Sequence, residues 1–486
     1  MPNSSAPVLA GFHPDPTICR VGADYYLATS SFEFFPGVPL FHSRDLAHWT
    51  PIGHALSRPS QLEPGELLPS KGVFAPTLRH HGGRFWMVTT NMSRMMDGQL
   101  IVHATDPAGP WSDPVHVPGA IGIDPDLAWD DAGNCYLTYC SFGVRGPAGI
   151  VQVPVDPATG AQLGDPYRLW QGTGLANPEG PHLYRIDGTW YLMLAEGGTE
   201  RGHAVTIARG PAPQGPFTPC PQNPILSHRS TTHPVQNTGH ADLVRAADGA
   251  WWAVHLGVRP HGVTPHFHVL GRETFLARVE WQDGWPRLTT ISRPGALEDH
   301  SFTDDFGGAT LHSRWVSPGG DPAAIATPHP SGGATLAPAG LLAFRVRDHA
   351  WTATAEVEGD TRFVLRLDDR HWYGLAVSVS VSGTTVRAIA RIGDLEQTVG
   401  SAEVASGPVT LRIAAAVPEG SGEPGDMSGP DEIVLSVGDA ELGRLDGRYL
   451  STEVAGGFTG RVLGAGALGD GASRLLSVSY SPAVNS

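Results

Sequence analysis

The sequence predicts an all-β protein, with a five-bladed β-propeller over residues 1–295 followed by a β-sandwich over residues 301–486. Three observations predict this class. A chain of 486 residues with 61 Gly, 43 Pro and 16% charged residues is typical of a compact, turn-rich protein whose length favours two domains. One pattern recurs five times in the first part. No segment keeps apolar residues at helical spacing over the length of a helix.

The repeat joins a short strand, a turn with Gly or Asp, and an aromatic-rich strand. Its five copies begin DPTICRVGADYYLAT, APTLRHHGGRFWMVTT, DPDLAWDDAGNCYLTY, GPHLYRIDGTWYLMLA and HADLVRAADGAWWAVHL. The aromatic strands are marked by Tyr26, Trp86, Tyr136, Tyr191 and Trp252. Their spacing of roughly 50–60 residues fits the four-stranded blades of a propeller.

The repeat is expected to end at Trp285. The segment LTTISRPGALEDHSFTDDF then indicates a linker, and alternating strands such as RFVLRLDD and VTLRIAAAV follow from about Ser301. Such strands, separated by Gly-rich turns, predict a sandwich. The stretch Pro418–Glu432, PEGSGEPGDMSGPDE, is too rich in Gly and Pro to pack and is expected to be a surface loop.

The formal net charge of −16 argues against nucleic acid and anionic membranes as partners, because phosphate binding depends on clustered cations. The four cysteines lack metal-ligand spacing and are expected to be buried thiols: Cys19, Cys135, Cys140 and Cys220. The first residues lack a signal-peptide pattern, and no stretch has the roughly 20 apolar residues of a membrane span. We therefore expect a cytoplasmic protein.

Equivalent early positions of the five repeats should converge, because the innermost strands of a propeller line its axis. Aligning the copies on their Ile or Leu puts five residues in one register: Asp15, Ala75, Asp124, Gly180 and His240. Glu179 lies one residue earlier, in a copy with one extra residue. Three carboxylates thus meet at one point, where burial and repulsion shift pKa values as glycosidic cleavage requires.

The third copy contains two candidate carboxylates in IDPDL, Asp124 and Asp126. Asp124 aligns with Asp15, whereas Asp126 aligns with Thr17, so we assign the role to Asp124. Because side chains alternate along a strand, both face the same side, and Asp126 stays a candidate neighbour of the site.

Six stretches of the first part of the chain carry a family resemblance: GFHPDPTICRVGADYYLATSSFEFFPGVPLFHSRDL, GVFAPTLRHHGGRFWMVTTN, GIDPDLAWDDAGNCYLTY, NPEGPHLYRIDGTWYLMLAEGGTERGHAVTIA, NTGHADLV and LGRETFL. They resemble glycoside hydrolase family 43, in its β-xylosidase/α-L-arabinofuranosidase branch. The second part, from DDFGGATLHSRW onward with DDRHWYGLAV, is similar to the concanavalin-like C-terminal sandwich of that branch. Asp126 departs from the family pattern, in which Ser is usual.

The resemblance implies roles for the three carboxylates. Asp15 in HPDPTI matches the general base, Asp124 in GIDPDL the residue that orients the acid and tunes its pKa, and Glu179 in NPEGPH the general acid. The implied mechanism is a single displacement with inversion, in which base and acid lie roughly 6.5–9.5 Å apart.

The resemblance also implies substrate-binding residues: Arg272 in LGRETF, Phe32 in SSFEFF, Phe74 in GVFAP, His240 in GHADLV and Thr199 in EGGTER. A strand-end surface arginine is the alternative for Arg272, and ordinary core packing is the alternative for the two phenylalanines. A structural Ca²⁺ near His240 is left open, although one histidine is a poor ligand for a hard cation. Catalysis is expected to need no cofactor.

Together with these residues, the resemblance implies an inverting exo-glycosidase that releases terminal β-D-xylose, α-L-arabinofuranose or both from xylan-derived oligosaccharides. A predominant α-L-arabinofuranosidase is the nearest rival. A retaining fructan hydrolase and a non-catalytic sugar-binding or scaffold propeller are more remote alternatives. The expected partner is a xylo- or arabino-oligosaccharide, a homo-oligomer is left open, and the second domain is expected to buttress the pocket rather than bind sugar by itself.

Overall fold

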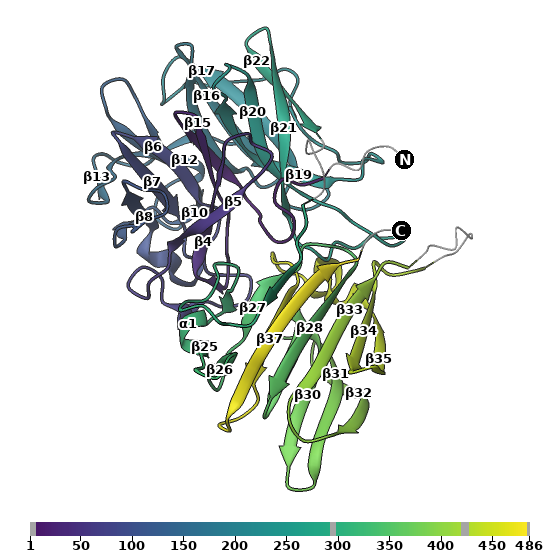
Figure 1. Cartoon of the computed structure of the whole chain (residues 1–486). Coiled ribbons are helices and arrows are strands. Elements are labelled where there is room, and N and C mark those ends of the chain that lie inside the picture. Colours follow the sequence, from purple (N-terminus) through teal and green to yellow (C-terminus); the bar gives the residue numbers. More distant parts are fainter. Residues whose placement is uncertain (1–5, 292–297, 419–426, 484–486) are drawn as a thin grey trace. The chain divides into compact units, whose positions relative to one another are not determined.

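The chain divides into two compact units in the computed structural model, which describes residues 6–291, 298–418 and 427–483 (Figure 1). Unit 1 consists of Met1–Phe32, Pro36–Val258 and Arg272–Gly295. Unit 2 consists of Glu33–Phe35, Arg259–Gly271 and Ala296–Ser486. Two short segments from the first 295 residues therefore group with unit 2.

Both units are built from β-strands, as the sequence predicts. The helices among the described residues are short: η1 Pro64–Glu66, η2 Met92–Asp97, α1 Pro322–Ile325, η3 Gly447–Leu450 and α2 Thr452–Ala455. None of the helices in the described part of the chain is long and apolar enough to cross a membrane.

The described residues of unit 1 form five antiparallel sheets. The strands of each sheet follow one another along the chain, except that the short strand Phe34–Phe35 of unit 2 interrupts the first sheet. The first sheet consists of β1 Thr17–Val21, β2 Asp24–Ala28, β4 Gly37–Ser43 and β5 Thr50–Leu56. The second consists of β6 Thr77–His81, β7 Arg84–Thr89, β8 Gln99–Ala104 and β9 Val115–Val117. The third consists of β10 Gly122–Trp129, β11 Cys135–Phe142, β12 Ala148–Asp156, β13 Ala161–Gln162 and β14 Tyr167–Trp170. The fourth consists of β15 Glu179–Ile186, β16 Thr189–Glu196, β17 Ala204–Gly210 and β18 Thr218–Pro219. The fifth consists of β19 Gln236–Arg245, β20 Trp251–Val258, β21 Glu273–Gln282 and β22 Trp285–Ile291.

Each predicted aromatic strand is the second strand of a sheet, namely β2, β7, β11, β16 and β20. The predicted end of the repeat at Trp285 is wrong, because Trp285 begins β22, the fourth strand of the fifth sheet. Leu288 in this strand is buried, and its neighbours Arg287 and Thr289 are exposed. The segment assigned to a linker thus begins with an alternating edge strand.

The first strands of the five sheets contact one another in a continuous order. β1 contacts β6 and β19, β10 contacts β6 and β15, and β15 contacts β19. Hydrophobic residues are buried between successive sheets, as where Leu137 of β11 joins Trp86 and Val88 of β7 in one cluster. The starts of the first strands are therefore brought together, and these starts carry the aligned residues.

The four cysteines are free thiols, as predicted. Cys19, Cys135 and Cys220 are buried, and Cys140 is half-buried. Burial raises the pKa of the Cys19 and Cys140 thiols to about 12, so they stay protonated at neutral pH.

The described residues of unit 2 form two large antiparallel sheets (Figure 1, green to yellow) and one small sheet. The first large sheet consists of β23 Phe302–Asp304, β25 Ala326–Pro328, β26 Ala334–Leu336, β28 Trp351–Glu358, β33 Val409–Ala416, β34 Glu432–Val437, β35 Ala440–Asp446 and β37 Ser473–Pro482. The second consists of β27 Leu342–Arg345, β29 Thr361–Arg366, β30 His371–Ser380, β31 Gly383–Ile392, β32 Leu395–Val404 and β36 Val462–Ala467. The small sheet pairs β3 Phe34–Phe35 with β24 Ser317–Pro318. Residues of both large sheets bury their apolar side chains in one cluster.

The predicted surface loop Pro418–Glu432 falls partly outside the described residues, at 419–426. Its last part differs from the prediction. Asp431 is 2% exposed and forms an ion pair with Arg461, which is itself fully buried. A buried guanidinium requires such a partner, and this requirement outweighs the Gly- and Pro-rich composition of the segment.

Candidate active site

Four of the five aligned residues share an unusual backbone conformation. Asp15, Asp124, Gly180 and His240 have φ angles of 51°, 56°, 57° and 48°. Strand pairing shifts register around the last three of them, as it does at a β-bulge. A bulge re-aims a side chain out of the normal alternation. The sequence register therefore corresponds to one local structure that recurs at the start of four sheets.

Asp15 is buried and its two carboxylate oxygens are both engaged. Arg272 donates from Nη1 to Oδ1 at 2.8 Å and from Nη2 to Oδ2 at 3.4 Å. Ser30 donates from Oγ to Oδ2 at 2.5 Å. Charge-assisted bonds to both oxygens leave the carboxylate little freedom to rotate.

Arg272 is the charged centre of the site rather than a surface arginine, because it is only 7% exposed. Its Nη1 also donates to Thr199 Oγ1 at 3.0 Å. The structure thus brings two of the expected binding residues, Arg272 and Thr199, to Asp15.

Asp124 and Glu179 both have raised pKa values. Burial is the main cause for each carboxyl, and the nearby charge of Asp15 adds to it, while Arg272 opposes the shift. Repulsion from Glu179 raises the pKa of Asp124 further, and the pKa of Glu179 lies at about 7. The cluster therefore retains a proton at neutral pH, because carboxylates close together in a poorly solvated site cannot all be ionised.

Asp124 also holds the backbone beside Glu179. The amide of Gly180 donates to Asp124 Oδ2 at 3.2 Å, and Gly180 directly follows Glu179. Asp124 is 7% exposed, whereas Glu179 is less deeply buried. The partly buried carboxyl of Glu179 suits a group that meets a ligand, and the more deeply buried carboxyl of Asp124 suits a group that orients Glu179.

His240 occupies the space that a side chain at Gly180 would need. A Cβ atom at Gly180 would lie 3.0 Å from the His240 ring, which explains why the fourth repeat has glycine in this register. Nδ1 of His240 lies 3.7 Å from Asp15 Oδ1. Burial lowers the pKa of His240 to about 4 despite the attraction of Asp15, so the imidazole is neutral at neutral pH.

The surroundings of His240 do not fit a calcium ion. Ca²⁺ takes six to eight oxygen ligands. The Asp15 oxygens already bind Arg272 and Ser30, and the groups that act on His240 include the imidazoles of His182 and His203 and the guanidinium of Arg272. Among the described residues, no group of three or more His, Cys, Asp and Glu side chains could hold a metal ion.

Phe32 and Phe74 lie in contact, with ring centroids 4.9 Å apart. The Arg272 guanidinium lies 5.4 Å from the Phe32 ring centre. Phe32 is only 2% exposed and Phe74 is half-buried, so Phe74 offers more surface to a ligand than Phe32 does.

Below these residues, a buried ionic network joins the first strands of all five sheets. Arg79 of β6 lies 2.9 Å from Asp126 of β10 and 2.8 Å from Asp242 of β19. Asp242 also accepts from Thr17 at 2.7 Å in β1 and from Tyr184 at 2.6 Å in β15. Asp126 thus lies in this deeper layer, as its alignment with Thr17 indicates.

Sequence reasoning missed Arg79 and Ser30. Arg79 lies four positions after Ala75, the aligned residue of the second repeat. Its own motif, TLRHHGG, is typical of an exposed turn. Asp126 and Asp242 could have pointed to Arg79, because two buried carboxylates need a cation beside them. Nothing in the sequence around Ser30 distinguishes it from the other small residues of its segment.

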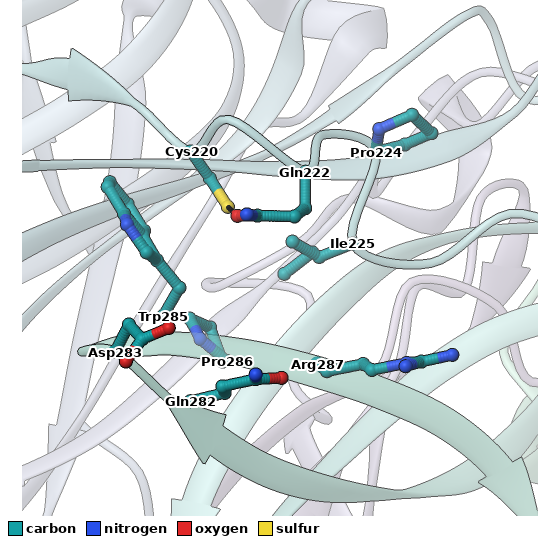
Figure 2. Close-up of a pocket in the computed structure, with 9 residues that line it drawn as sticks. All are labelled: Cys220, Gln222, Pro224, Ile225, Gln282, Asp283, Trp285, Pro286 and Arg287. Carbon is teal, nitrogen blue, oxygen red and sulfur yellow. Dashed lines mark hydrogen bonds between the residues drawn. The ribbon is translucent and has the colours of Figure 1, made fainter.

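A separate cavity lies away from this cluster, between the segment 220–225 and the hairpin of β21 and β22 (Figure 2). It measures about 340 Å³ and is lined by Cys220, Gln222, Pro224, Ile225, Gln282, Asp283, Trp285, Pro286 and Arg287. Asp283 is the one carboxylate among these lining residues. The cavity therefore lacks the pair of carboxyl groups that glycosidic cleavage uses.

Comparison with known proteins places the chain in a family. The model of glycosyl hydrolases family 43 matches residues 4–286. A non-reducing end α-L-arabinofuranosidase of Bacteroides ovatus is 36% identical, covering 96% of this chain and 91% of that protein. A xylosidase/arabinosidase of Butyrivibrio fibrisolvens is 47% identical over 58% of this chain and 55% of its own length.

Solved structures resemble the whole chain. The crystal structure of a xylan β-1,4-xylosidase from Bacillus halodurans C-125 has a TM-score of 0.86 at 28% identity and covers 99% of this chain and 100% of that one. The Bacteroides ovatus xyloglucan PUL GH43B structure has a TM-score of 0.85 at 35% identity, with 98% of each chain covered. The chain is thus a glycosidase, and it belongs to glycosyl hydrolase family 43.

Proposed function

We propose that the protein is an inverting exo-glycosidase that releases terminal β-D-xylose, α-L-arabinofuranose or both from xylan-derived oligosaccharides. One observation carries the proposal. A carboxylate fixed by an arginine, Asp15, shares a buried cluster with a carboxyl whose pKa is about 7, Glu179. One group can activate water while the other donates a proton, which are the two tasks of inverting hydrolysis.

In the proposed reaction, Asp15 accepts a proton from water as the water oxygen attacks the anomeric carbon. Glu179 donates its proton to the departing glycosidic oxygen, so that the C–O bond breaks to give a free hydroxyl. Arg272 and Ser30 hold Asp15 in orientation, and Asp124 holds the peptide beside Glu179.

We further propose that the five sheets of unit 1 are the blades of a propeller, and that the two large sheets of unit 2 form a concanavalin-like sandwich. The continuous order of contacts from β1 through β6, β10, β15 and β19 back to β1 supports the first arrangement. The shared apolar cluster supports the second. A site at the convergence of five blades suits a chain end, and this favours exo action.

Both pentoses are candidates for the released sugar, because one relative is named for arabinofuranose and another for xylose and arabinose together. Xylopyranose and arabinofuranose can present similarly placed hydroxyl groups to one pocket. A predominant α-L-arabinofuranosidase is therefore the second candidate, favoured by the relative that covers nearly the whole chain.

Progress-curve NMR on xylobiose and on an arabino-xylo-oligosaccharide tests both sugar and stereochemistry. The first product anomer should have the configuration opposite to that of the cleaved bond. Asp15→Ala and Glu179→Ala should each abolish turnover while the circular dichroism spectrum stays that of the wild type. Retained configuration, or near-normal activity in either folded variant, would overturn the proposal.

A further inference from the structure

Glu196 is a buried carboxylate of unit 1 that the proposed reaction does not use. It is the last residue of β16 and is 0% exposed. Thr206 donates from Oγ1 to its Oε1 at 2.6 Å. The Thr173 amide donates to both carboxylate oxygens at 3.0 Å, and Thr173 Oγ1 donates to Oε2 at 3.1 Å. These neutral donors compensate the loss of water around the carboxylate.

Through Thr173, Glu196 holds the loop that leads into the proposed general acid. The loop covers residues 171–178 and runs directly into Glu179 at the start of β15. Every residue of the loop is exposed or half-buried, so its own side chains contribute little to fixing it. A Cβ atom at Gly172 would lie 3.0 Å from Oε2 of Glu196, so the loop backbone packs directly against the carboxylate. Glu196 thus anchors the loop in the core.

The residues that follow β16 hold the same loop closer to its end. The Gly197 amide donates to the Ala176 carbonyl at 2.6 Å. Asn177, two residues before Glu179, has a φ of 49°, which a non-glycine residue keeps only where its surroundings fix it. A Cβ atom at Gly198 would lie 3.1 Å from Nδ2 of Asn177, so the two segments pass in close contact.

Glu179 depends on this support because strand pairing is irregular on its other side. It pairs with Ala195, the residue directly before Glu196, and the register then shifts before the next pair at His182. A general acid must lie within hydrogen-bond reach of the leaving oxygen, and a small displacement is enough to slow proton transfer. The loop that precedes Glu179 therefore bears on how well its carboxyl is placed.

We infer that Glu196 is a positioning residue for the proton donor: by anchoring the loop 171–178, it places the Glu179 carboxyl for transfer to the leaving oxygen. Its own burial keeps it from touching the substrate, so it acts through the loop. This role rests on the proposed function, in which Glu179 is the general acid.

Glu196→Ala removes the anchor, and two leaving groups show whether proton donation is what suffers. We expect kcat for xylobiose or an arabino-xylo-oligosaccharide, whichever the wild type cleaves, to fall at least about tenfold. With the dinitrophenyl glycoside of the same pentose, kcat should change by less than about threefold, because dinitrophenol departs without a proton. Equal losses on the two substrates would overturn the role, since a general loss of structure does not distinguish leaving groups.

The alkaline side of the pH profile gives a second readout. The charged and titratable groups that act with Glu179 include Asp15, Asp124, Cys140 and Arg272, and the variant keeps all of them. Burial is the main cause of the raised pKa of Glu179. A loosened loop admits water, so this pKa should fall, and kcat/KM should decline at a lower pH than in the wild type. A decline at the same or a higher pH would contradict the role.

Glu196→Gln is the conservative variant. Its amide oxygen can still accept from Thr173, and its amide nitrogen can donate to the Thr206 hydroxyl. The anchor is therefore kept, and kcat should return to within about threefold of the wild type on both substrates. A Glu196→Gln variant as slow as Glu196→Ala would show that the charge matters rather than the hold on the loop, and the inference would fail.

Asp130→Ala is the matched control, because Asp130 also holds a turn through its carboxylate. It accepts from the amides of Ala132 and Asn134 at 3.0 and 2.9 Å. Asp130 follows the end of β10, whereas Asp124 lies near the start of that strand. The control should lower the melting temperature and change kcat on either substrate by less than about twofold. The same selective loss in Asp130→Ala would refute a specific role for Glu196.

If Glu196→Ala does not fold, Thr173→Ala is measured instead. Thr173 is exposed, and the change removes its hydroxyl donor but keeps its amide. The kcat for the oligosaccharide should fall about threefold, with that for the dinitrophenyl glycoside unchanged. A wild-type ratio of the two kcat values in whichever variant folds would overturn the inference. Near-normal activity in Glu179→Ala would instead contradict the proposed function.

Discussion

At the scale of single residues, the site is held in conformations that cost energy. Asp15, Asp124 and His240 each have positive φ, which costs of order 1–3 kcal/mol for a non-glycine residue. Asp124 and Glu179 add the cost of burial, expressed in their raised pKa values. Such residues persist only where the surrounding structure fixes their conformation. Here the hydrogen bond from Ser30 fixes Asp15, and the hydrogen bond from the Gly180 amide fixes Asp124.

The pKa of Glu179, about 7, predicts the alkaline side of the pH profile. A general acid works only while protonated, so kcat/KM should fall as the pH rises through about 7. The fall should be seen with xylobiose, whose leaving group needs a proton. It should be weaker with a dinitrophenyl glycoside, whose leaving group does not. Equal pH profiles for the two substrates would argue against Glu179 as the acid.

The same pKa has a consequence for stability. A carboxyl group whose pKa is higher in the folded state than in the unfolded state makes the fold more stable at low pH than at high pH. For Glu179 this contribution is complete below the unfolded pKa of about 4.5 and is lost as the pH rises through about 7. Glu179→Gln replaces the ionisable carboxyl group with an amide, so the side chain no longer gains or loses a proton with pH. We expect the variant to be more stable than the wild type by about 1–3 kcal/mol at pH 8 and no more stable near pH 4, as measured by urea unfolding.

At the scale of secondary-structure elements, the repeat is what made the site predictable. Period-two alternation and turn residues located the strands, and the aligned Ile or Leu located the residues with positive φ. The alignment could not reveal that a bulge turns these side chains, because bulges arise from strand pairing between segments far apart in space. It also could not assign Glu33–Phe35 to unit 2, since this depends on pairing with Ser317 and Pro318.

Gly180 offers a test at this scale. A Cβ atom there would lie 3.0 Å from the His240 ring on a backbone with φ of 57°. We expect Gly180→Ala to lower kcat at least tenfold, because the displaced ring adjoins Asp15 and the peptide follows Glu179. The measurement is steady-state kinetics on an aryl glycoside.

Gly188→Ala, in the turn between β15 and β16 of the same sheet, is the control. Gly188 also has a positive φ, 83°, but nothing lies within 4 Å of its Cβ position. It should cost about 1 kcal/mol of stability and leave kcat near the wild-type value. If the two variants lost activity equally, backbone strain rather than the contact with His240 would be the cause.

At the scale of the molecule, the network around Arg79 is what ties the five sheets of unit 1 together. Burial opposes ionisation of Arg79 and Asp242, but attraction between opposite charges outweighs it. Asp126 and then Asp242 raise the pKa of Arg79, and Arg79 lowers the pKa of Asp242. A sequence cannot readily predict such a network, since its members come from five segments that meet only after folding.

We expect Arg79→Met to destabilise the protein by about 3–5 kcal/mol, because it leaves Asp126 and Asp242 buried without their cation. Arg44→Met is the control, since Arg44 pairs with Asp24 at the surface and is 79% exposed. Its effect should stay below about 1 kcal/mol. Denaturant unfolding of both variants measures the difference, and equal values would show that the network does not hold the sheets together.

The free cysteines have a practical consequence for labelling this protein with fluorophores. All four thiols have raised pKa values, with burial as the main cause, so the natural chain should react slowly with maleimides at neutral pH. A cysteine introduced at an exposed position in each unit would then be the preferred attachment point for a fluorophore. The separation of the two dyes could be watched while an oligosaccharide is bound and released.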